Sequence, residues 1–318
     1  MDLSIVVPLL NERESLPVLA ERLHDVIGTM GVDHEIIFVD DGSNDGSWEV
    51  ITALAAADDR VKGIRFGHNY GKSPALNEGF RAAQGRVVIT MDADLQDDPD
   101  EVPELFRMIT EDGWDLVSGW KKKRYDPLSK TIPTKFFNWT TRRVSGVMLH
   151  DFNCGLKAYR KEVVKSIEVF GEMHRYIPFI AKKEGFTRIG EKVVKHHPRK
   201  YGKTKFGFDR FINGFLDLLT ITFVFRFGRK PMHFFGALGT LMFVLGLGAT
   251  TWVVGEKAWY SFVLDRPAPR VADSGLFFIA LTAMIIGVQL FTMGFVAELV
   301  RRYSPERNVY RVKERLGL

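Results

Sequence analysis

Two long uncharged stretches in the last third of the chain constrain its fold more than any other feature. Residues 234–254 and 274–297 contain no formally charged side chain, over 21 and 24 residues respectively. Crossing the hydrocarbon core of a bilayer takes about 20 apolar residues, so each stretch is long enough for a transmembrane helix. Two buried core helices are the weaker alternative. We therefore expect two transmembrane helices, at about 232–255 and 274–299.

Basic residues around these stretches predict the side of the membrane on which the rest of the chain lies. The flanking segments 222–231 and 299–318 hold nine Lys and Arg residues, whereas the connecting segment 256–273 holds three. In membrane proteins the excess of Lys and Arg lies on the cytosolic side. The N-terminal sequence has no basic leader, and its apolar run is too short for a signal peptide. An integral protein of a bacterial-type inner or plasma membrane is therefore expected, with its N-terminal domain and both termini in the cytosol.

The first part of the chain alternates strand-like and helix-like patterns. Buried-strand patterns occupy 3–10, 35–40, 61–66 and 86–92, and helical patterns occupy 14–30, 47–57 and 72–84. Ser47 is expected to cap the second helix, and Gly85 to end the third. Alternation of this kind predicts an α/β fold with a Rossmann-like, doubly wound, mainly parallel sheet. The expected domains are 1–205, an interfacial segment 206–230, and 231–318 with the two transmembrane helices and a basic cytosolic tail.

Acidic residues gather where the predicted strands end. Glu12 follows the first strand, Asp40 and Asp41 the second, and Asp92 and Asp94 the fourth. Ligands of doubly wound sheets bind beyond the carboxyl ends of the strands. Because Asp92 and Asp94 stand two residues apart, their side chains can point the same way and hold a hard cation such as Mg²⁺ or Mn²⁺. Taken alone, this short motif is better explained by a solvated turn.

Other ligand motifs are excluded by spacing. An EF-hand loop counted from Asp92 would need glycine where Asp97 stands and glutamate where Pro103 stands. The first strand is followed by "PLLNERE" without the glycines of a dinucleotide-binding turn, and "GKS" at 71–73 lacks the leading glycine of a P-loop, because position 66 is Phe66. The net charge of +5 is too small to indicate a nucleic-acid partner.

Four segments together carry a family resemblance. "IVVPLLNERESL", "FVDDGSNDGS", "RFGHNYGKSPALNEGF" and "MDADLQDDPDEVPEL" resemble, in this order, the motifs of inverting glycosyltransferases with the GT-A fold. The "DADLQ" form, with two C-terminal spans, resembles the polyprenyl-phosphate (dolichyl-phosphate) sugar synthases in particular. The resemblance implies a UDP- or GDP-hexose donor, Mg²⁺ or Mn²⁺ as cofactor, and an undecaprenyl- or dolichyl-type phosphate acceptor.

The resemblance also assigns roles to individual residues. It implies nucleotide-sugar contacts for Pro8, Glu12, Asp40, Asp41, Lys72 and Asp92, a metal site at Asp92, Asp94 and Gln96, and catalytic roles for Asp94 and Asp151. Lys72 would pair with the donor diphosphate, or is simply an exposed lysine at a helix start. Asp151 would approach the donor sugar, with Gly155 allowing a close backbone approach. Whether Asp94 or Asp151 acts as a base or only positions a substrate stays open.

Basic residues before the membrane segments are candidates for contact with the acceptor phosphate. They are Lys123, Arg124, Arg199, Lys203 and Lys205. A solvated loop and a juxtamembrane patch on anionic lipid are the alternatives. The following segment 206–230 mixes bulky apolar and charged residues, so it is expected to lie at the membrane interface. Cys154 and His174 are expected to pack in the core instead of reacting.

Three other functions were weighed against polyprenyl-phosphate glycosyl transfer. A processive polysaccharide synthase would carry a Q-x-x-R-W motif, which does not occur. Sugar transfer to a lipid alcohol such as diacylglycerol would need a stronger base and is the second choice. A non-catalytic membrane partner would not need Asp92, Asp94 and Asp151. The sequence leaves the oligomeric state open, a homo-oligomer included.

Overall fold

The computed structural model describes residues 1–122, 138–143, 145–171, 173–198, 231–265, 267, 270–303 and 312–317. These residues form two compact units. The first contains everything described up to residue 198 together with the C-terminal residues 312–317, and the second contains a pair of long helices. The predicted acceptor residues Lys123, Arg124, Arg199, Lys203 and Lys205 and the segment 206–230 lie outside the described residues.

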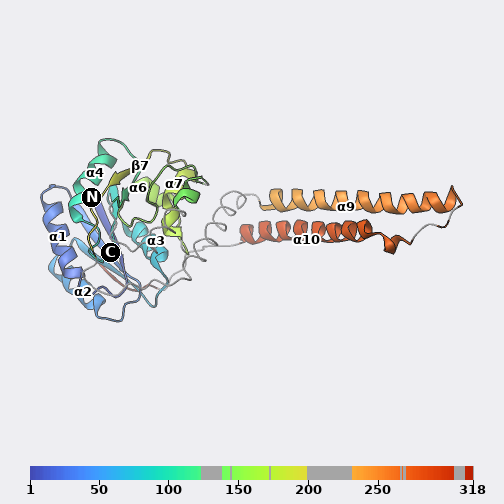
Figure 1. Ribbon diagram of the computed structural model, residues 1–318. Coiled ribbons are helices and arrows are strands. Elements are labelled where there is room, and N and C mark those ends of the chain that lie inside the picture. Colours follow the sequence, from blue (N-terminus) through green and yellow to red (C-terminus); the bar gives the residue numbers. More distant parts are fainter. Residues whose placement is uncertain are drawn as a thin grey trace. The chain divides into compact units, whose positions relative to one another are not determined.

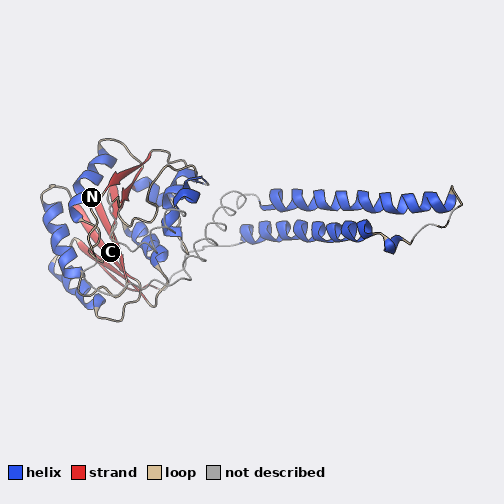
Figure 2. Cartoon of the chain, in the orientation of Figure 1, coloured by secondary structure: helices blue, strands red, loops and turns tan. Residues whose placement is uncertain are grey.

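The first unit is built on one eight-stranded mixed sheet, which Figure 2 shows in red between helices. The strands are β1 (Leu3–Leu9), β2 (His34–Asp40), β3 (Val61–Phe66), β4 (Val87–Thr90), β5 (Leu116–Trp120), β6 (Lys157–Arg160), β7 (Ile189–Val193) and β8 (Val312–Leu316). Their order is β7-β5-β6-β4-β1-β2-β3-β8. Strands β3, β2, β1 and β4 are parallel, as predicted. The antiparallel strands β6 and β8 were not predicted.

Helices cover both faces of this sheet (Figure 1). They are α1 (Leu16–Gly28), α2 (Ser47–Ala57), α3 (Lys72–Ala82), α4 (Val102–Thr110), α6 (Lys161–Ser166) and α7 (Ile177–Lys183), with single 3₁₀ turns at Pro99–Glu101 and Met173–Tyr176. Helix α1 contacts both α2 and α4, while α3 contacts β1, β2 and α6. The three helices expected from the sequence are therefore present. Successive β-α units place α1 and α2 on one face and α3 on the other.

One local prediction was wrong. Ser47 does not cap α2 but is its first residue, and the cap position is Gly46 with a φ of 91°. The carboxylate of Asp45 accepts hydrogen bonds from the Ser47 amide at 3.0 Å and from its hydroxyl at 2.6 Å. Aspartate therefore satisfies the helix start that serine was expected to satisfy.

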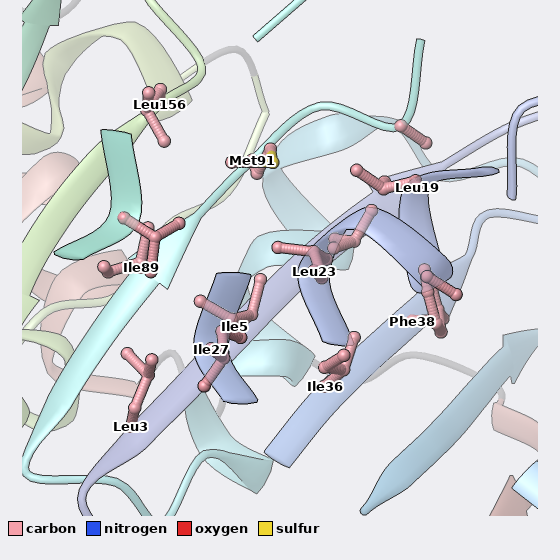
Figure 3. Close-up of a cluster of buried hydrophobic side chains, with 14 of the residues drawn as sticks. Leu3, Ile5, Leu19, Leu23, Ile27, Ile36, Phe38, Ile89, Met91 and Leu156 are labelled. Carbon is pink, nitrogen blue, oxygen red and sulfur yellow. The ribbon is translucent and has the colours of Figure 1, made fainter. Parts of the chain in front are cut away.

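The main hydrophobic core lies between the sheet and α1. Figure 3 shows side chains of β1 and β2 meeting those of α1, among them Leu3, Ile5, Leu23, Ile27 and Phe38. Each of these five is fully buried. The buried positions of α1 recur at helical spacing, which turns one face of the helix toward the sheet. This packing fixes β1 and β2, whose carboxyl ends carry the candidate site.

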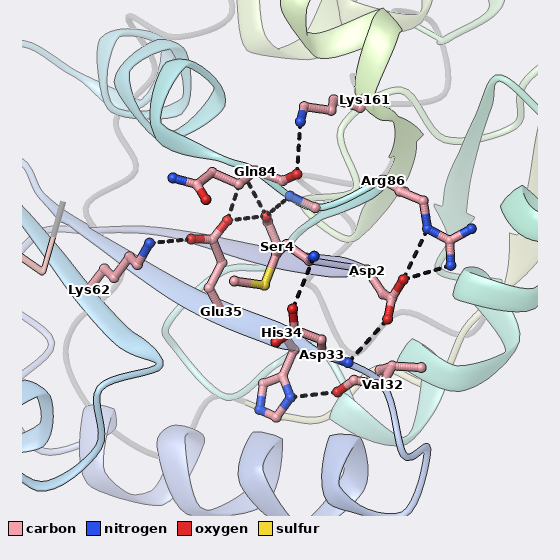
Figure 4. Close-up of polar contacts among 12 residues, drawn as sticks. Asp2, Ser4, Val32, Asp33, His34, Glu35, Lys62, Gln84, Arg86 and Lys161 are labelled. Carbon is pink, nitrogen blue, oxygen red and sulfur yellow. Dashed lines mark hydrogen bonds and ion pairs between the residues drawn. The ribbon is translucent and has the colours of Figure 1, made fainter.

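A buried polar cluster ties the starts of the strands together (Figure 4). Glu35 in β2 has no exposed surface, and its carboxylate accepts a hydrogen bond from the Ser4 hydroxyl and one from the Gln84 amide at 2.7 Å. The ammonium of Lys62 in β3 lies 2.8 Å from the same carboxylate. One carboxylate thus links β1, β2, β3 and the turn before β4.

Replacing Glu35 by alanine is expected to destabilise the first unit by about 3–5 kcal/mol, because it leaves Lys62 as an unpaired cation that is only 12% exposed. Thermal unfolding of the full chain in detergent, followed by circular dichroism, measures the effect. Arg86→Ala is the matched control, since its ion pair with Asp2 lies at the surface, where such pairs contribute little to stability. Equal shifts for the two variants would contradict the prediction.

The second unit consists of α9 (Pro231–Phe262) and α10 (Gly275–Tyr303), joined through a short 3₁₀ turn at Val271–Asp273. Both helices are long and apolar enough to cross a membrane. Only 17% of the most apolar window of α9 and 11% of that of α10 are buried. Two core helices would be mostly buried, so the exposure favours helices that face lipid.

Glycines let the two long helices approach closely. A Cβ atom at Gly239 would lie 2.5 Å from the carbonyl oxygen of Gly287, and one at Gly287 would lie 2.6 Å from the carbonyl oxygen of Gly239. Gly246 meets the Ala280 carbonyl in the same way, at 2.6 Å. Small residues at such contacts are typical of helix pairs in membranes, where close backbone packing replaces the hydrophobic effect as the driving force.

The C-terminal residues return to the first unit. Strand β8 pairs antiparallel with β3 at the edge of the sheet, opposite Gly63, Ile64, Arg65 and Phe66. Glu314 accepts a hydrogen bond from the indole N–H of Trp48 at 3.0 Å, and Arg315 lies 3.2 Å from the carboxylate of Glu78. The end of the segment expected to be a basic tail is therefore a strand of the sheet.

Candidate active site

The carboxyl ends of three parallel strands bring the predicted site residues to one edge of the sheet. Strand β1 lies between β2 and β4, with Leu9 opposite Asp40. Glu12 follows β1, Asp40 ends β2, and Asp92 comes two residues after β4. The same strand pairing that buries the core therefore brings acidic groups from distant parts of the chain to one edge of the sheet.

The turn after β4 alternates between buried and accessible side chains. Asp92, Asp94 and Gln96 are half-buried, whereas Ala93, Leu95 and Asp97 are buried. Leu95 has a φ of 58°, and the Gln96 amide donates a hydrogen bond to the Asp94 carboxylate at 3.2 Å. The three residues expected to hold a metal thus keep access to solvent.

The two following carboxylates have partners within the chain. Asp97 lies 2.7 Å from the ammonium of Lys121, and both side chains are largely buried. Asp98 lies 2.7 Å from the guanidinium of Arg22 and 2.9 Å from the ring of His197. These pairs hold the turn in place, and the side chains of Asp97 and Asp98 are buried, whereas those of Asp92 and Asp94 reach solvent.

Asp92 is charged because cations surround it. Burial opposes its charged form, but Lys72, Lys121 and Lys157 together outweigh this and hold the pKa of Asp92 below its ordinary value. Lys72, the first residue of α3, forms a direct ion pair with the Asp92 carboxylate. Lys72, which is expected to bind the donor diphosphate, and Asp92, which is expected to bind the metal, therefore lie in contact.

The segment 151–157 packs against Asp92. A Cβ atom at Gly155 would lie 2.5 Å from the Asp92 carboxylate, so only glycine fits there without displacing Asp92. The Thr90 hydroxyl donates to the Gly155 carbonyl at 2.8 Å. Lys157 is buried and donates from its ammonium to the carbonyls of Phe152, at 3.2 Å, and Cys154. Both contacts hold the segment against the end of β4.

Asp151 and Cys154 lie within this segment. Asp151 is 1% exposed, and its carboxylate accepts a hydrogen bond from the Asn153 amide at 3.0 Å. Lys157 lies close enough to both Asp151 and Asp92 to interact with their charges. Burial raises the pKa of the Cys154 thiol to about 12, so it stays protonated at neutral pH and is no nucleophile.

The predicted nucleotide side of the site is formed at the ends of β1 and β2. Pro8 is buried in β1 opposite Val39 of β2, and Glu12 is half-buried. Asp40 accepts from the Ser43 amide at 2.9 Å and lies 3.6 Å from Arg65. Burial raises the pKa of Asp40, and hydrogen bonds from Ser43 and the charge of Arg65 oppose that rise.

Asp41 fixes the loop that leads into α3. Its carboxylate accepts hydrogen bonds from the amides of Tyr70 and Gly71, at 2.7 and 2.9 Å. Gly42 has a φ of 78°, and a Cβ atom there would lie 2.7 Å from the backbone of His68. The loop after β2 and the loop before α3 are therefore in backbone contact, which positions Lys72 at the site.

The residues just before the basic segment 199–205 pack against the turn after β4. The His197 amide donates to the Gln96 carbonyl at 2.9 Å, and Asp97 and His196 form an antiparallel bridge. Pro198 is the last described residue before Arg199. Residues 196 and 197, shortly before the basic segment 199–205, therefore lie beside the turn that carries Asp92, Asp94 and Gln96.

Two largely buried lysines beside the candidate site received no role from the sequence. They are Lys121 and Lys157. Lys157 begins β6 in mixed sequence, and only the structure shows that its neighbours Leu156, Ala158 and Tyr159 are fully buried. A lysine in such a strand is rarely buried without a partner. The Ser73 hydroxyl lies 3.1 Å from the ring of His174, which supports the helix start at Lys72.

Comparisons with known proteins agree with this geometry. The family model described as "Glycosyl transferase family 2" matches residues 4–168. The dodecaprenyl-phosphate galacturonate synthase of Rhizobium johnstonii is 34% identical over 306 residues, covering 95% of this chain and 88% of the relative. This chain belongs to glycosyl transferase family 2. The undecaprenyl-phosphate 4-deoxy-4-formamido-L-arabinose transferase of Pectobacterium atrosepticum is 33% identical over 302 residues, covering 95% of this chain and 88% of that one.

Solved structures agree on the fold of this family 2 glycosyltransferase. Glucosyl-3-phosphoglycerate synthase of Mycobacterium tuberculosis, crystallised with Mn²⁺, UDP and glucosyl-3-phosphoglycerate, matches with a TM-score of 0.52. The match covers 71% of this chain and 80% of that one, at 20% identity. The expected GT-A fold and the two membrane-type helices are confirmed, as is the resemblance to polyprenyl-phosphate glycosyltransferases.

Proposed function

We propose that this enzyme transfers a sugar from a UDP- or GDP-sugar to a polyprenyl phosphate at the cytosolic face of the membrane, with inversion at the anomeric carbon. The observation that carries the proposal is the turn after β4. It presents Asp92, Asp94 and Gln96 at the same sheet edge as the nucleotide-side residues, and it is hydrogen-bonded to the chain that enters the basic segment 199–205. The curated relatives with matching length support the lipid phosphate as acceptor.

The carboxylates of Asp92 and Asp94 fit a divalent cation that also binds the diphosphate of the nucleotide-sugar. Among the described residues, no group of three or more His, Cys, Asp or Glu side chains could form a metal cage. Mg²⁺ is usually bound by one or two carboxylates together with substrate phosphates and water, and Asp92 and Asp94 supply two carboxylates. The Mn²⁺ and UDP in the structural neighbour point the same way. When bound, Mg²⁺ or Mn²⁺ would stabilise charge on the departing nucleoside diphosphate.

The chain's own groups supply binding and orientation. Pro8, Glu12, Asp40 and Asp41 line the nucleotide side, and Lys72 at the start of α3 offers a cation to the diphosphate. The second pKa of a phosphate is near 6, so the acceptor is largely a dianion at neutral pH and needs little help from a base. Its oxygen attacks the anomeric carbon as the bond to the diphosphate breaks. Asp94 and Asp151 then act by orienting the reactants, which fits the burial of Asp151.

The acceptor phosphate itself is assigned to Lys123, Arg124, Arg199, Lys203 and Lys205, and the segment 206–230 to the membrane interface. The cytosolic orientation rests on the excess of basic residues beside α9 and α10. Strand β8 supports the placement of both termini on one side of the membrane, because the chain that follows α10 pairs with the sheet that precedes α9. Two membrane crossings allow this pairing.

Purified full-length enzyme in neutral detergent is expected to release nucleoside diphosphate only when polyprenyl phosphate is present, and only with Mg²⁺ or Mn²⁺. Mass spectrometry of the lipid products over a panel of UDP- and GDP-sugars identifies the donor. Release with polyprenol or diacylglycerol instead would establish a lipid-alcohol acceptor, and no release with any donor would indicate a non-catalytic partner. Undiminished turnover in excess EDTA would overturn the metal assignment.

A further inference from the structure

The ammonium of Lys72 lies on the carboxylate that is proposed to bind the metal. Lys72 and Asp92 are 31% and 32% exposed, so both side chains reach solvent while they pair. Of the three lysines that act on the charge of Asp92, Lys121 pairs with Asp97, and Lys157 donates to the carbonyls of Phe152 and Cys154. Lys72 is the one whose ammonium forms an ion pair with Asp92 itself.

A divalent cation on Asp92 would compete with this ion pair. A metal and an ammonium on the same carboxylate repel each other, and the repulsion is strong in a site partly shielded from water. Lys72 has a flexible stem, and it begins the 11-residue helix α3, whose N-terminus favours an anion. A donor diphosphate that arrives with the metal offers the displaced ammonium a new partner beside its old one.

We propose that Lys72 is an exchangeable counterion: it holds Asp92 in the absence of ligand and transfers to the donor diphosphate when the metal takes its place. This inference rests on the proposed function. Binding of the metal alone must break the Lys72–Asp92 pair without replacing it. Binding of metal and diphosphate together replaces one ion pair by another. Lys72 therefore disfavours the metal alone and favours the complete donor complex, which couples the two binding events.

The sign of the effect on metal affinity distinguishes this role from a plain diphosphate ligand. Removing the charge with Lys72→Met should strengthen Mn²⁺ binding in the absence of nucleotide, by about 5-fold or more, since coupling of this kind is typically 5- to 150-fold. The same variant should bind Mn²⁺ more weakly than the wild type when nucleoside diphosphate is present. A residue that only binds diphosphate would leave the affinity for Mn²⁺ alone unchanged.

Electron paramagnetic resonance of Mn²⁺ measures both affinities on the full-length protein in neutral detergent, with and without UDP or GDP. Lys72→Arg keeps the charge and should keep the wild-type order of affinities. Lys122→Met controls for the change in net charge, because it also removes one positive charge. Lys122 is exposed, and its ammonium lies over the ring of Trp120. Thermal unfolding of each variant shows whether the fold is kept.

The outcomes separate the inference from the function on which it rests. One outcome would overturn the exchange and leave the proposed function standing. In it, Mn²⁺ binds the wild type in the presence of nucleotide, but without nucleotide it binds Lys72→Met no more tightly than it binds the wild type or Lys122→Met. Wild-type protein that binds no Mn²⁺ with either diphosphate would overturn the metal-dependent function and the exchange together. If Lys72→Met binds Mn²⁺ more tightly than the wild type without nucleotide and more weakly with it, the result supports both the exchange and the metal-dependent function.

Discussion

Replacing Asp92 by asparagine is expected to lower sugar transfer by about 100- to 1,000-fold, the usual effect of removing one preorganised electrostatic group at the reacting centre. Asparagine matches aspartate in size, so the packing against Gly155 and the fold should be kept. What is lost is the negative charge that pairs with Lys72 and that, in the proposed function, also binds the metal. Steady-state turnover with polyprenyl phosphate, alongside thermal unfolding, measures the two effects separately.

Asp100→Asn is the matched control for that experiment. Asp100 belongs to the same acidic run, but its carboxylate is 58% exposed and lies 3.6 Å from Arg22, away from Lys72. Its removal should leave turnover near the wild-type value. If Asp92→Asn kept turnover within a few-fold of the wild type, Asp92 would not be the ligand that the proposed function requires.

Adding one methyl group at Gly155 should be nearly as damaging, although no charge changes. The new Cβ would lie 2.5 Å from the Asp92 carboxylate, so Asp92 must move. A displacement of about 1 Å at a reacting centre can cost about 100-fold in rate, and this is the loss we expect for Gly155→Ala. Turnover and Mn²⁺ affinity should fall together, because the same carboxylate is displaced in both measurements.

The control for Gly155→Ala is Gly28→Ala at the end of α1, where a Cβ atom would meet no atom within 4 Å. It should retain wild-type turnover and metal affinity. Wild-type turnover in Gly155→Ala would mean that the 151–157 segment or Asp92 can shift without consequence. That result would remove the argument that this segment positions the carboxylate.

The parallel half of the fold could be predicted because its signals are local. Each of the strands β1 to β4 is an apolar run, and each intervening helix has a helical pattern of its own. Strand β8 could not be predicted in this way. Its sequence, "VKERL", is charged, and it is a strand because it pairs with the edge of β3. Its side chains Glu314 and Arg315 find their partners in Arg65 of β3, Trp48 of α2 and Glu78 of α3. Such partners are a tertiary property.

The candidate site likewise has a part that local sequence predicts and a part that depends on tertiary contacts. The spacing of Asp92, Asp94 and Gln96 predicted side chains that share one accessible side, and the alternating burial of the turn agrees. The buried cations were missed, because Lys121 and Lys157 stand in basic or mixed sequence and become visible only once Asp97 and the carbonyl of Cys154 are placed beside them. Asp41 was expected to face a ligand, and here its carboxylate binds two backbone amides.

The pairing of β8 with β3 sets an order of events during synthesis. Glu314 and its partner Trp48 are 266 residues apart in the chain, and both long apolar helices are encoded between them. A ribosome therefore completes the helix pair before the last strand of the sheet exists. Until then β3 presents an unpaired edge, the kind of surface on which other chains aggregate. If translation stopped after the second helix, the protein would lack β8, and the edge of β3 would stay unpaired.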